Sequence, residues 1–303
     1  MLIFNPRAGK VIRTGGALIE RAGRILTKQG HNLTVAPTTG PRVAGEIARE
    51  HIRQGADLIV VAGGDGTVNE AAEGMLGTDV PLAILPAGTA NVLAMETKLG
   101  GNLERVAGRL DELKPRRISV GHVTCDGGKV SRHFLLMAGI GLDAHVVYNI
   151  NAGLKAKTGK FAYWVAGWSL LGKRLAEFDV ELAGQHRRCS FALLSKVRNY
   201  GGDFEIARSV TLLDDEFEVV LFEGPSSTGY VKYFAGMALN KLAGMSGVTV
   251  LRAAEIRVSK PADRGAYIQI DGEFVGHLPA ELKIVPNALT VLVPAEYGSV
   301  KKS

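Results

Sequence analysis

The hydrophobic positions in the first 117 residues alternate between short continuous runs and stretches where apolar residues recur every three or four positions. A short apolar run bounded by turn residues indicates a buried strand, and the wider spacing indicates an amphipathic helix. Strands alternating with helices predict a mostly parallel sheet covered on both faces. The expected strands are 2–4, 33–35, 58–62 and 82–85, with helices around 18–26, 43–52, 68–76, from 91 and around 103–110.

The pattern changes near Pro115, after which strand-like runs dominate. They are 118–124, 134–138, 178–182, 190–197, 217–222, 248–258, 267–270, 282–285 and 289–293. Many strands with few helices predict a sandwich-like domain. We therefore expect an N-terminal doubly wound α/β domain over 1–117 and a C-terminal β-sandwich-like domain over 118–303. Whether the last strand returns to the first domain stays open.

Composition narrows the class of protein. The chain has 303 residues, 46% of them hydrophobic and 22% charged, which is typical of a globular protein. Its net charge of +6 suits an anionic membrane surface, nucleic acid or a phosphorylated substrate. Nucleic acid is the weakest of these, because aromatic residues make up only 6% and no RNA-binding motif occurs. Without a signal-peptide pattern or an apolar stretch of about 18 residues, we expect a cytoplasmic protein.

The spacing of cysteines and histidines argues against a disulfide scaffold and against a metal site ligated by these residues. Cys125 and Cys189 stand alone without a CxxC pair, which argues against a disulfide scaffold or a cysteine-ligated zinc site. The seven histidines show no HExxH or similar spacing, so a histidine-ligated metal is not expected.

The segment 63–67, Gly-Gly-Asp-Gly-Thr, follows the strand 58–62 and directly precedes a helix. Glycines let the backbone approach a ligand that a Cβ would block. The helix N-terminus offers unpaired N–H groups to an anion. The Asp65 carboxylate would repel a phosphate unless a cation lay between them. The segment therefore predicts a nucleotide phosphate together with Mg²⁺.

Similar turns follow the other strands of the predicted sheet. The segment 5–10 follows the first strand, Thr38 the second, and 86–91 the fourth. Because ligands bind at the carboxyl ends of parallel strands, these turns are expected to line one crevice. The spacing in 5–10 is not that of a P-loop. The structural alternative for Thr89 or Asn91 is a helix N-cap.

The segment 139–144 matches the dinucleotide pattern GxGxxA, but no acidic residue lies between Ala144 and Ala176. We therefore reject NAD binding there and expect a structural turn or part of an acceptor cleft. Asp271-Gly272 predicts a type I′ hairpin turn. At its tip, Asp271 and Glu273 could supply a general base or a metal-bridging carboxylate.

Two further segments have two interpretations each. The acidic cluster 212–216 either binds a cation through a carboxylate and main-chain carbonyls or forms a solvated turn. The aromatic segment 155–168 is flanked by lysines. It is either a buried core helix or a helix that rests on an anionic membrane.

Taken together, the turns 5–10, 63–67 and 86–91 and the segment 271–273 resemble the diacylglycerol kinase catalytic family, especially the soluble bacterial lipid kinases related to sphingosine and ceramide kinases. The resemblance implies ATP bound between the two domains. It implies ATP contacts from Asn5, Pro6, Arg7, Ala8, Gly9, Thr38, Gly63, Gly64, Asp65, Gly66, Thr67, Val68, Asn69 and Thr89. It also implies Glu273, close to Asp271, as proton acceptor, and a metal site at Asp215 with the carbonyls of Leu212 and Phe217.

The chain departs from the family pattern at two positions. Many members have Asp after the residue equivalent to Asn91, whereas this chain has Val92, so one acidic nucleotide contact is missing. Many have Asp-Asp-Gly in the metal loop, whereas Glu216 stands here in place of Gly. A residue with a Cβ does not adopt every backbone conformation open to glycine.

These observations predict an ATP-dependent lipid kinase that phosphorylates a hydroxyl of a diacylglycerol-like or sphingoid lipid. Catalysis is assigned to Glu273, Asp271 and Asp65, the last of which helps to hold Mg²⁺ at the phosphates. The alternatives are an NAD kinase-like enzyme and a non-catalytic nucleotide- or lipid-binding regulator. The expected partners are a lipid substrate and, transiently, an anionic membrane surface, with no nucleic acid. A homodimer stays open.

Overall fold

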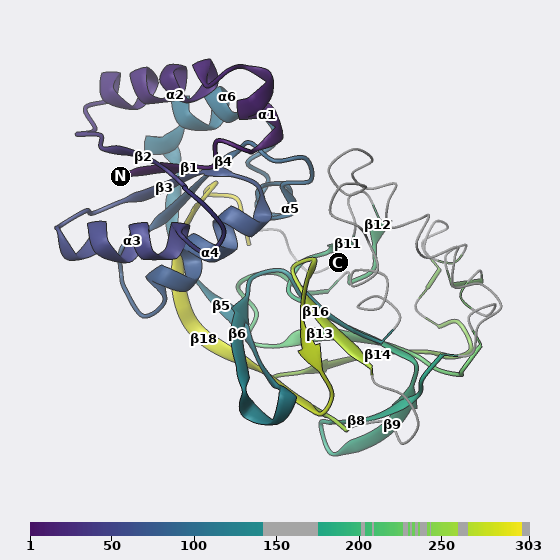
Figure 1. Cartoon of the computed structure of the whole chain (residues 1–303). Helices are drawn as coiled ribbons and strands as arrows, with labels where there is room; N and C mark the ends of the chain where they lie inside the picture. The colour runs from purple at the N-terminus through teal and green to yellow at the C-terminus, as the bar shows by residue number, and fades with distance from the viewer. Residues whose placement is uncertain are drawn as a thin grey trace. The chain divides into compact units, whose positions relative to one another are not determined.

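The computed structural model describes residues 1–141, 175–200, 204–207, 209–226, 230, 232–233, 236, 241–242, 244–259 and 266–298. The segment 155–168 and residues 142–144 of the GxGxxA match lie outside them. The chain divides into two compact units (Figure 1). Unit 1 comprises Met1–Ser119 and Pro286–Ser303, and unit 2 comprises Val120–Val285.

Unit 1 is built on a parallel sheet. The strands run in the order β2, β1, β3, β4, and the C-terminal part of β18 joins parallel to β4 through the pair Val291 and Leu82. Every residue of β3 and β4 is buried, as expected for a sheet covered on both faces. The strands are β1 (Leu2–Phe4), β2 (Val35–Pro37), β3 (Ile59–Gly63), β4 (Leu82–Pro86) and β18 (Ala280–Val293).

Helices cover both faces of this sheet, which confirms the architecture expected from the alternating pattern (Figure 1). Apolar residues of α1 (Gly9–Arg13), α2 (Ala17–Lys28) and α6 (Leu103–Gly108) form one core with the sheet. On the other face, α3 (Ala44–Arg53) packs against α4 (Asp65–Met75). The short α5 (Val92–Glu96) follows the turn after β4.

Unit 2 is a sandwich of antiparallel sheets, as the sequence predicted. One sheet runs in the order β14, β13, β10, β7, β16, β17, and the other contains β5, β6, β8, β9, β15 and the N-terminal part of β18. Buried residues of both sheets form a common core. The strands are β5 (Lys114–Cys125), β6 (Val130–Phe134), β7 (Met137–Gly141), β8 (Phe178–Leu182), β9 (Gln185–Cys189), β10 (Phe191–Ser195), β11 (Asn199–Tyr200), β12 (Phe204–Glu205), β13 (Phe217–Phe222), β14 (Val248–Ala253), β15 (Glu255–Val258), β16 (Tyr267–Ile270) and β17 (Glu273–His277).

Several predicted strand boundaries are wrong. The run 134–138 divides between β6 and β7, and the run 248–258 divides between β14 and β15, which belong to different sheets. The runs 282–285 and 289–293 form the single strand β18. An apolar run reports burial, and it does not show where a strand changes partners. Strand β9 was not predicted because its first four residues are exposed.

Candidate functional site

The glycine-rich turns of unit 1 lie together at the carboxyl edge of its sheet and are hydrogen-bonded to one another. The Asn5 side-chain amide donates to Thr67 Oγ1 at 3.0 Å. The main-chain N–H of Lys10 donates to the carbonyl of Ala87 at 3.1 Å. The N–H of Ala87 in turn donates to the carbonyl of Gly63 at 2.9 Å. The structure therefore brings the predicted turns after β1, β3 and β4 into one cluster.

Two of these turns touch through glycines. A Cβ placed on Gly88 would lie 2.5 Å from the Cα of Gly64, a distance that real Cβ atoms do not show. The side chain of Asn91 stabilises the turn after β4 through two hydrogen bonds to the main chain of Gly88. Its Oδ1 accepts the Gly88 N–H at 2.8 Å, and its Nδ2 donates to the Gly88 carbonyl at 2.9 Å. Asn91 makes no side-chain capping bond to α5. Close packing thus accounts for these glycines in addition to any approach of a ligand.

Asp65 has a partner that the sequence did not reveal. Its Oδ1 accepts the N–H of Leu93, in the first turn of α5, at 3.1 Å. Burial raises the pKa of Asp65, and main-chain hydrogen bonds from the start of α5 oppose that rise. The N–H groups of a helix start stabilise a carboxylate. The Asp65 charge therefore has a positive partner without a cation, and its predicted role at Mg²⁺ stays a prediction.

Lys10 is a residue whose role sequence reasoning missed. Its ammonium donates to the carbonyl of Pro86 at 3.1 Å and to the carbonyl of Gly101. Burial, reinforced by the charge of Arg13, lowers the pKa of Lys10. The side chain thus ties the turn after β1 to the segments on either side of α5. Its place in the Gly9-Lys10 pair was visible in the sequence, but its carbonyl partners were not.

The predicted nucleotide contacts differ in accessibility. Pro6, Arg7, Gly9 and Thr89 are exposed at the turns. Asn5, Gly64, Asp65, Gly66 and Asn69 are partly exposed. Ala8, Thr38, Gly63, Thr67 and Val68 are buried. At Ala8 and Val68 the buried side chain faces the protein, so a ligand at this edge would meet their main chain.

In unit 2, Asp271 and Gly272 form the turn between β16 and β17. Both have positive φ, 47° and 81°, as a type I′ turn requires, so the hairpin prediction is confirmed. The Asp271 carboxylate accepts the N–H groups of Leu135, Leu136 and Met137, each at 2.9 Å. Leu135 and Leu136 lie between β6 and β7, and Met137 is the first residue of β7. Asp271 is therefore engaged in holding the hairpin against the start of β7.

Glu273 differs from Asp271 in its surroundings. Its side chain is 52% exposed, and its Oε2 lies 3.9 Å from a guanidinium nitrogen of Arg132, which is 18% exposed. Of the two acidic residues of the hairpin, Glu273 is thus the more exposed. The sequence alone left the division of roles between them open.

The predicted metal loop lies before β13. Leu212 and Phe217 are buried and Asp215 is exposed. The carbonyl of Asp214 accepts a hydrogen bond from the ammonium of the buried Lys196. Burial lowers the pKa of Lys196 to about 8, and the charges of Asp214 and Asp215 oppose that effect. No group of three or more His, Cys, Asp or Glu side chains suited to a metal ion occurs among the described residues.

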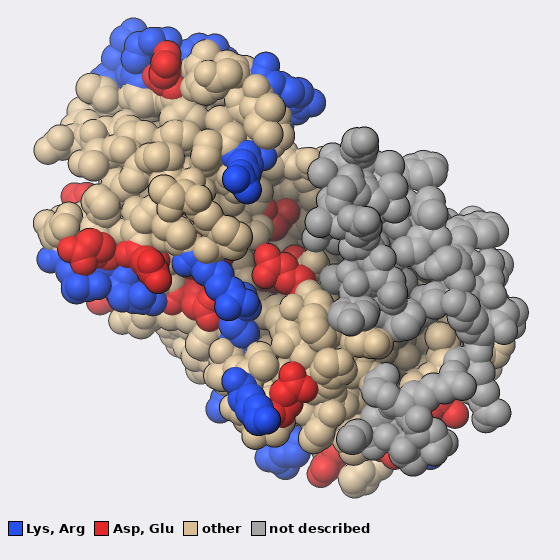
Figure 2. Space-filling model, viewed as in Figure 1, with Lys and Arg blue, Asp and Glu red and all other residues tan. Residues whose placement is uncertain are grey.

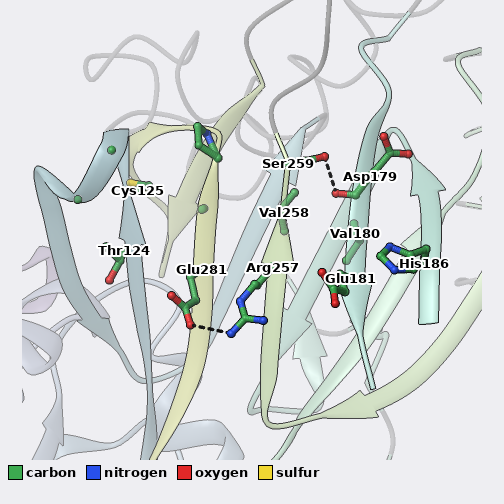
Figure 3. A pocket seen from close by; sticks show the side chains of 14 residues that line it. Thr124, Cys125, Asp179, Val180, Glu181, His186, Arg257, Val258, Ser259 and Glu281 are labelled. Atoms are coloured by element: carbon green, nitrogen blue, oxygen red, sulfur yellow. Dashed lines mark hydrogen bonds and ion pairs between the residues drawn. The ribbon is translucent and has the colours of Figure 1, made fainter. Parts of the chain in front are cut away.

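A cavity of about 440 Å³ lies in unit 2 (Figure 3). Its wall includes Glu281 of β18 and Arg257 of β15, which form an ion pair at 3.8 Å. Ser259 Oγ donates to the carbonyl of Asp179 at 3.2 Å across the same wall. None of the predicted site residues lines this cavity, and the guanidinium of Arg257 in its wall is already paired with Glu281. We assign no function to it.

The fold and the turns define a two-part protein, an α/β unit with glycine-rich turns followed by a β-sandwich unit with an acidic hairpin. Residues 1–123 match the model of the diacylglycerol kinase catalytic domain. Residues 137–293 match the model of the YegS C-terminal NAD kinase beta sandwich-like domain. The chain belongs to the diacylglycerol kinase catalytic domain family with this C-terminal domain.

Similar proteins extend over nearly the whole chain. A diacylglycerol kinase of Mycobacterium tuberculosis is 29% identical over 299 residues, which cover 96% of this chain and 94% of that protein. A diacylglycerol kinase of Bacillus subtilis is 26% identical and covers 97% of this chain and 96% of its own. The crystal structure of a diacylglycerol kinase from Bacillus anthracis matches with a TM-score of 0.78 at 22% identity, over 99% of this chain and 97% of that one. In the described part of this chain, no helix has the length and apolar character needed to cross a membrane.

Proposed function

We propose that the protein is an ATP-dependent lipid kinase that transfers the γ-phosphoryl group to a hydroxyl of a diacylglycerol-like or sphingoid lipid. The family match and the similarity to proteins named diacylglycerol kinase support a lipid kinase. The observation that carries the catalytic part is the division of roles in the hairpin. Asp271 is held by main-chain N–H groups, whereas Glu273 is half-exposed beside Arg132.

In this proposal the interlocked turns of unit 1 bind the nucleotide. Main-chain N–H groups and the hydroxyls of Thr38, Thr67 and Thr89 are suited to hydrogen-bond phosphate or ribose oxygens. Mg²⁺ enters with ATP as part of the substrate and neutralises charge on the phosphates. Asp65 fixes the start of α5 against the turn 63–67, which keeps the phosphate-binding amides in position.

The acceptor step needs a group that takes the hydroxyl proton. The lipid oxygen attacks the γ-phosphorus, the bond from that phosphorus to the ADP oxygen breaks, and the proton passes to the Glu273 carboxylate. Arg132, at 3.9 Å, orients that carboxylate. Asp271 acts as a positioning residue, because its oxygens hold the hairpin to Leu135, Leu136 and Met137. Positioning and charge neutralisation supply most of the rate enhancement.

A lipid acceptor requires the protein to reach a membrane surface, and its charge favours an anionic one. The net charge is +6. Lys and Arg side chains gather over α2 at the top of the view in Figure 2. On this helix Arg24 and Lys28 are exposed. Attraction of such residues to anionic headgroups is screened by salt over a Debye length of about 8 Å at physiological ionic strength.

Transfer of labelled phosphate from ATP tests the function. The purified protein is incubated with Mg²⁺ and γ-labelled ATP, and separately with diacylglycerol, monoacylglycerol, sphingosine and ceramide in mixed micelles, or with NAD. We expect label in one class of lipid. Label in NAD would instead support an NAD kinase-like enzyme. ATP binding without transfer to any acceptor would support a non-catalytic regulator.

A further inference from the structure

The loop from Thr211 to Glu216, which leads into β13, contains the residues for which the family resemblance implies a metal ion. A main-chain carbonyl and a carboxylate are suitable ligands for a hard cation. In this chain, however, cationic side chains already occupy the inner side of the loop. Lys196 follows β10 directly, and its side chain is fully buried at 0% exposure. Its ammonium donates to the carbonyl of Asp214, in the middle of the loop.

A second cation holds the same loop from the neighbouring strand. Arg252 of β14 places Nη2 3.0 Å from Asp214 Oδ1 and Nε 3.1 Å from Glu216 Oε2. Its Nη1 also donates to the carbonyl of Ser209 at 3.2 Å. The other oxygen of Asp214 accepts the N–H of Thr211 at 2.8 Å and the Thr211 hydroxyl at 2.7 Å. The carboxylate of Asp214 is thus fully engaged inside the protein.

The predicted ligand Asp215 follows Asp214 in the loop but differs from it in burial. It is exposed to solvent, next to Glu216, which also is exposed and pairs with Arg252. A divalent ion coordinated by the loop carbonyls would lie close to the Lys196 ammonium, and the two like charges would repel each other without solvent to screen them. The residues present therefore do not fit the implied metal ion.

We propose that Lys196 and Arg252 are built-in cations that take the place of a structural metal ion in the loop 211–216. The Lys196 ammonium donates a hydrogen bond to a carbonyl of the loop from the protein interior. The Arg252 guanidinium, from β14, neutralises the carboxylates of Asp214 and Glu216. The fold of this loop then depends on the chain alone. Glu216 fits this arrangement, because a glycine at its position would lack the carboxylate that Arg252 binds. The proposal does not depend on the kinase activity.

Thermal unfolding without nucleotide tests this proposal, because Mg²⁺ bound with ATP is then absent. The Tm of the wild type and of Asp215→Asn is measured in excess EDTA and in millimolar MgCl2 or CaCl2. We expect the Tm of each protein to be the same under all these conditions. A wild-type Tm that falls in EDTA and recovers with Mg²⁺ or Ca²⁺, with the response abolished in Asp215→Asn, would overturn the proposal.

Removal of the proposed cations gives the complementary measurement. Lys196→Met keeps much of the side-chain volume without the charge, and it should lower Tm by roughly 5–15 °C in EDTA and in MgCl2 alike. Arg252 is partly exposed, so Arg252→Gln should lower Tm by a smaller amount. This variant replaces Lys196→Met in the measurement if Lys196→Met does not fold. If the measured variant is as stable as the wild type, its cation does not support the loop and the proposal is wrong.

Discussion

Asp271 and Met137 exchange hydrogen bonds in both directions. The Met137 N–H donates to Asp271 Oδ1 at 2.9 Å, and the Asp271 N–H donates to the Met137 carbonyl at 2.9 Å. This pair joins the tip of the hairpin to the first residue of β7. It fixes the backbone from which Glu273, two residues further along, projects.

Replacing Asp271 should therefore affect stability as well as turnover. Asp271→Ala leaves the N–H groups of Leu135, Leu136 and Met137 without this acceptor. An unsatisfied donor costs about 1–3 kcal/mol, so we expect a loss of at least that size in the free energy of unfolding. Urea unfolding measures it, with Glu273→Gln as the matched control at an exposed position. Equal stability of Asp271→Ala and the wild type would show that the carboxylate does not hold the hairpin.

The contact between Gly64 and Gly88 predicts a second effect. Gly88→Ala places a Cβ 2.5 Å from the Gly64 Cα, so the two turns must separate. Overpacking of this kind typically costs about 1–3 kcal/mol, and we expect ATP affinity to fall as well. Gly108→Ala, in α6 with nothing within 4 Å of the added Cβ, is the control and should leave both quantities near wild type. Unchanged ATP affinity in a folded Gly88→Ala protein would contradict the assignment of these turns to the nucleotide.

Two substitutions of Asp65 separate its hydrogen bond to the start of α5 from its predicted action on Mg²⁺. Asp65→Asn keeps an oxygen that can accept the Leu93 N–H, so the Tm should stay close to that of the wild type. Its lost charge should lower turnover if Asp65 acts on Mg²⁺ of the nucleotide. Asp65→Ala removes the acceptor as well and should cost about 1 kcal/mol of stability. Steady-state kinetics and Tm, measured for both variants, distinguish the two roles. Full turnover of Asp65→Asn would show that Asp65 does not act on Mg²⁺ and only supports the start of α5.

The pair His122 and His133 predicts a pH dependence of stability. Burial, and then the charge of His122 with a ring centroid 4.7 Å away, lowers the pKa of His133 from 6.5 to about 4. Between these values the unfolded chain binds the proton more readily than the folded one. Stability from this group is complete above pH 6.5 and is lost as the pH falls toward 4. His133→Gln should flatten this decline in urea unfolding across that range, and an unchanged slope would contradict the assignment.

The sequence predicted those parts of the fold that follow from local patterns. The helices of unit 1, its buried strands and the Asp271-Gly272 turn were visible because periodicity and turn chemistry act over a few residues. The partners of Asp65, Lys10 and Lys196 were not visible. Each of these charges is satisfied by main-chain groups 18 to 91 residues away, and no spacing pattern encodes such a contact. The role of Asp65 at a cation therefore stays a prediction, beside its observed bond to the start of α5.

The division of β14 from β15 shows the same limit at the level of topology. The run 248–258 is strand-like throughout and predicts one strand, yet Ala254 lies between two strands that belong to different sheets. Long-range pairing decides where a strand ends, and its partners, such as β13 and β18, lie elsewhere in the chain.

In the proposed mechanism Glu273 accepts the proton of the lipid hydroxyl, and the substitution Glu273→Gln removes that function. The side chain is half-exposed and its partner Arg132 lies at 3.9 Å, so the substitution should leave Tm and ATP affinity near those of the wild type. Loss of a general base typically lowers the rate by about 10²–10⁴, and kcat and kcat/KM should fall together. The measurement is steady-state transfer of labelled phosphate to the lipid that the wild type phosphorylates. A folded Glu273→Gln protein with wild-type kcat on that lipid would show that Glu273 is not the proton acceptor.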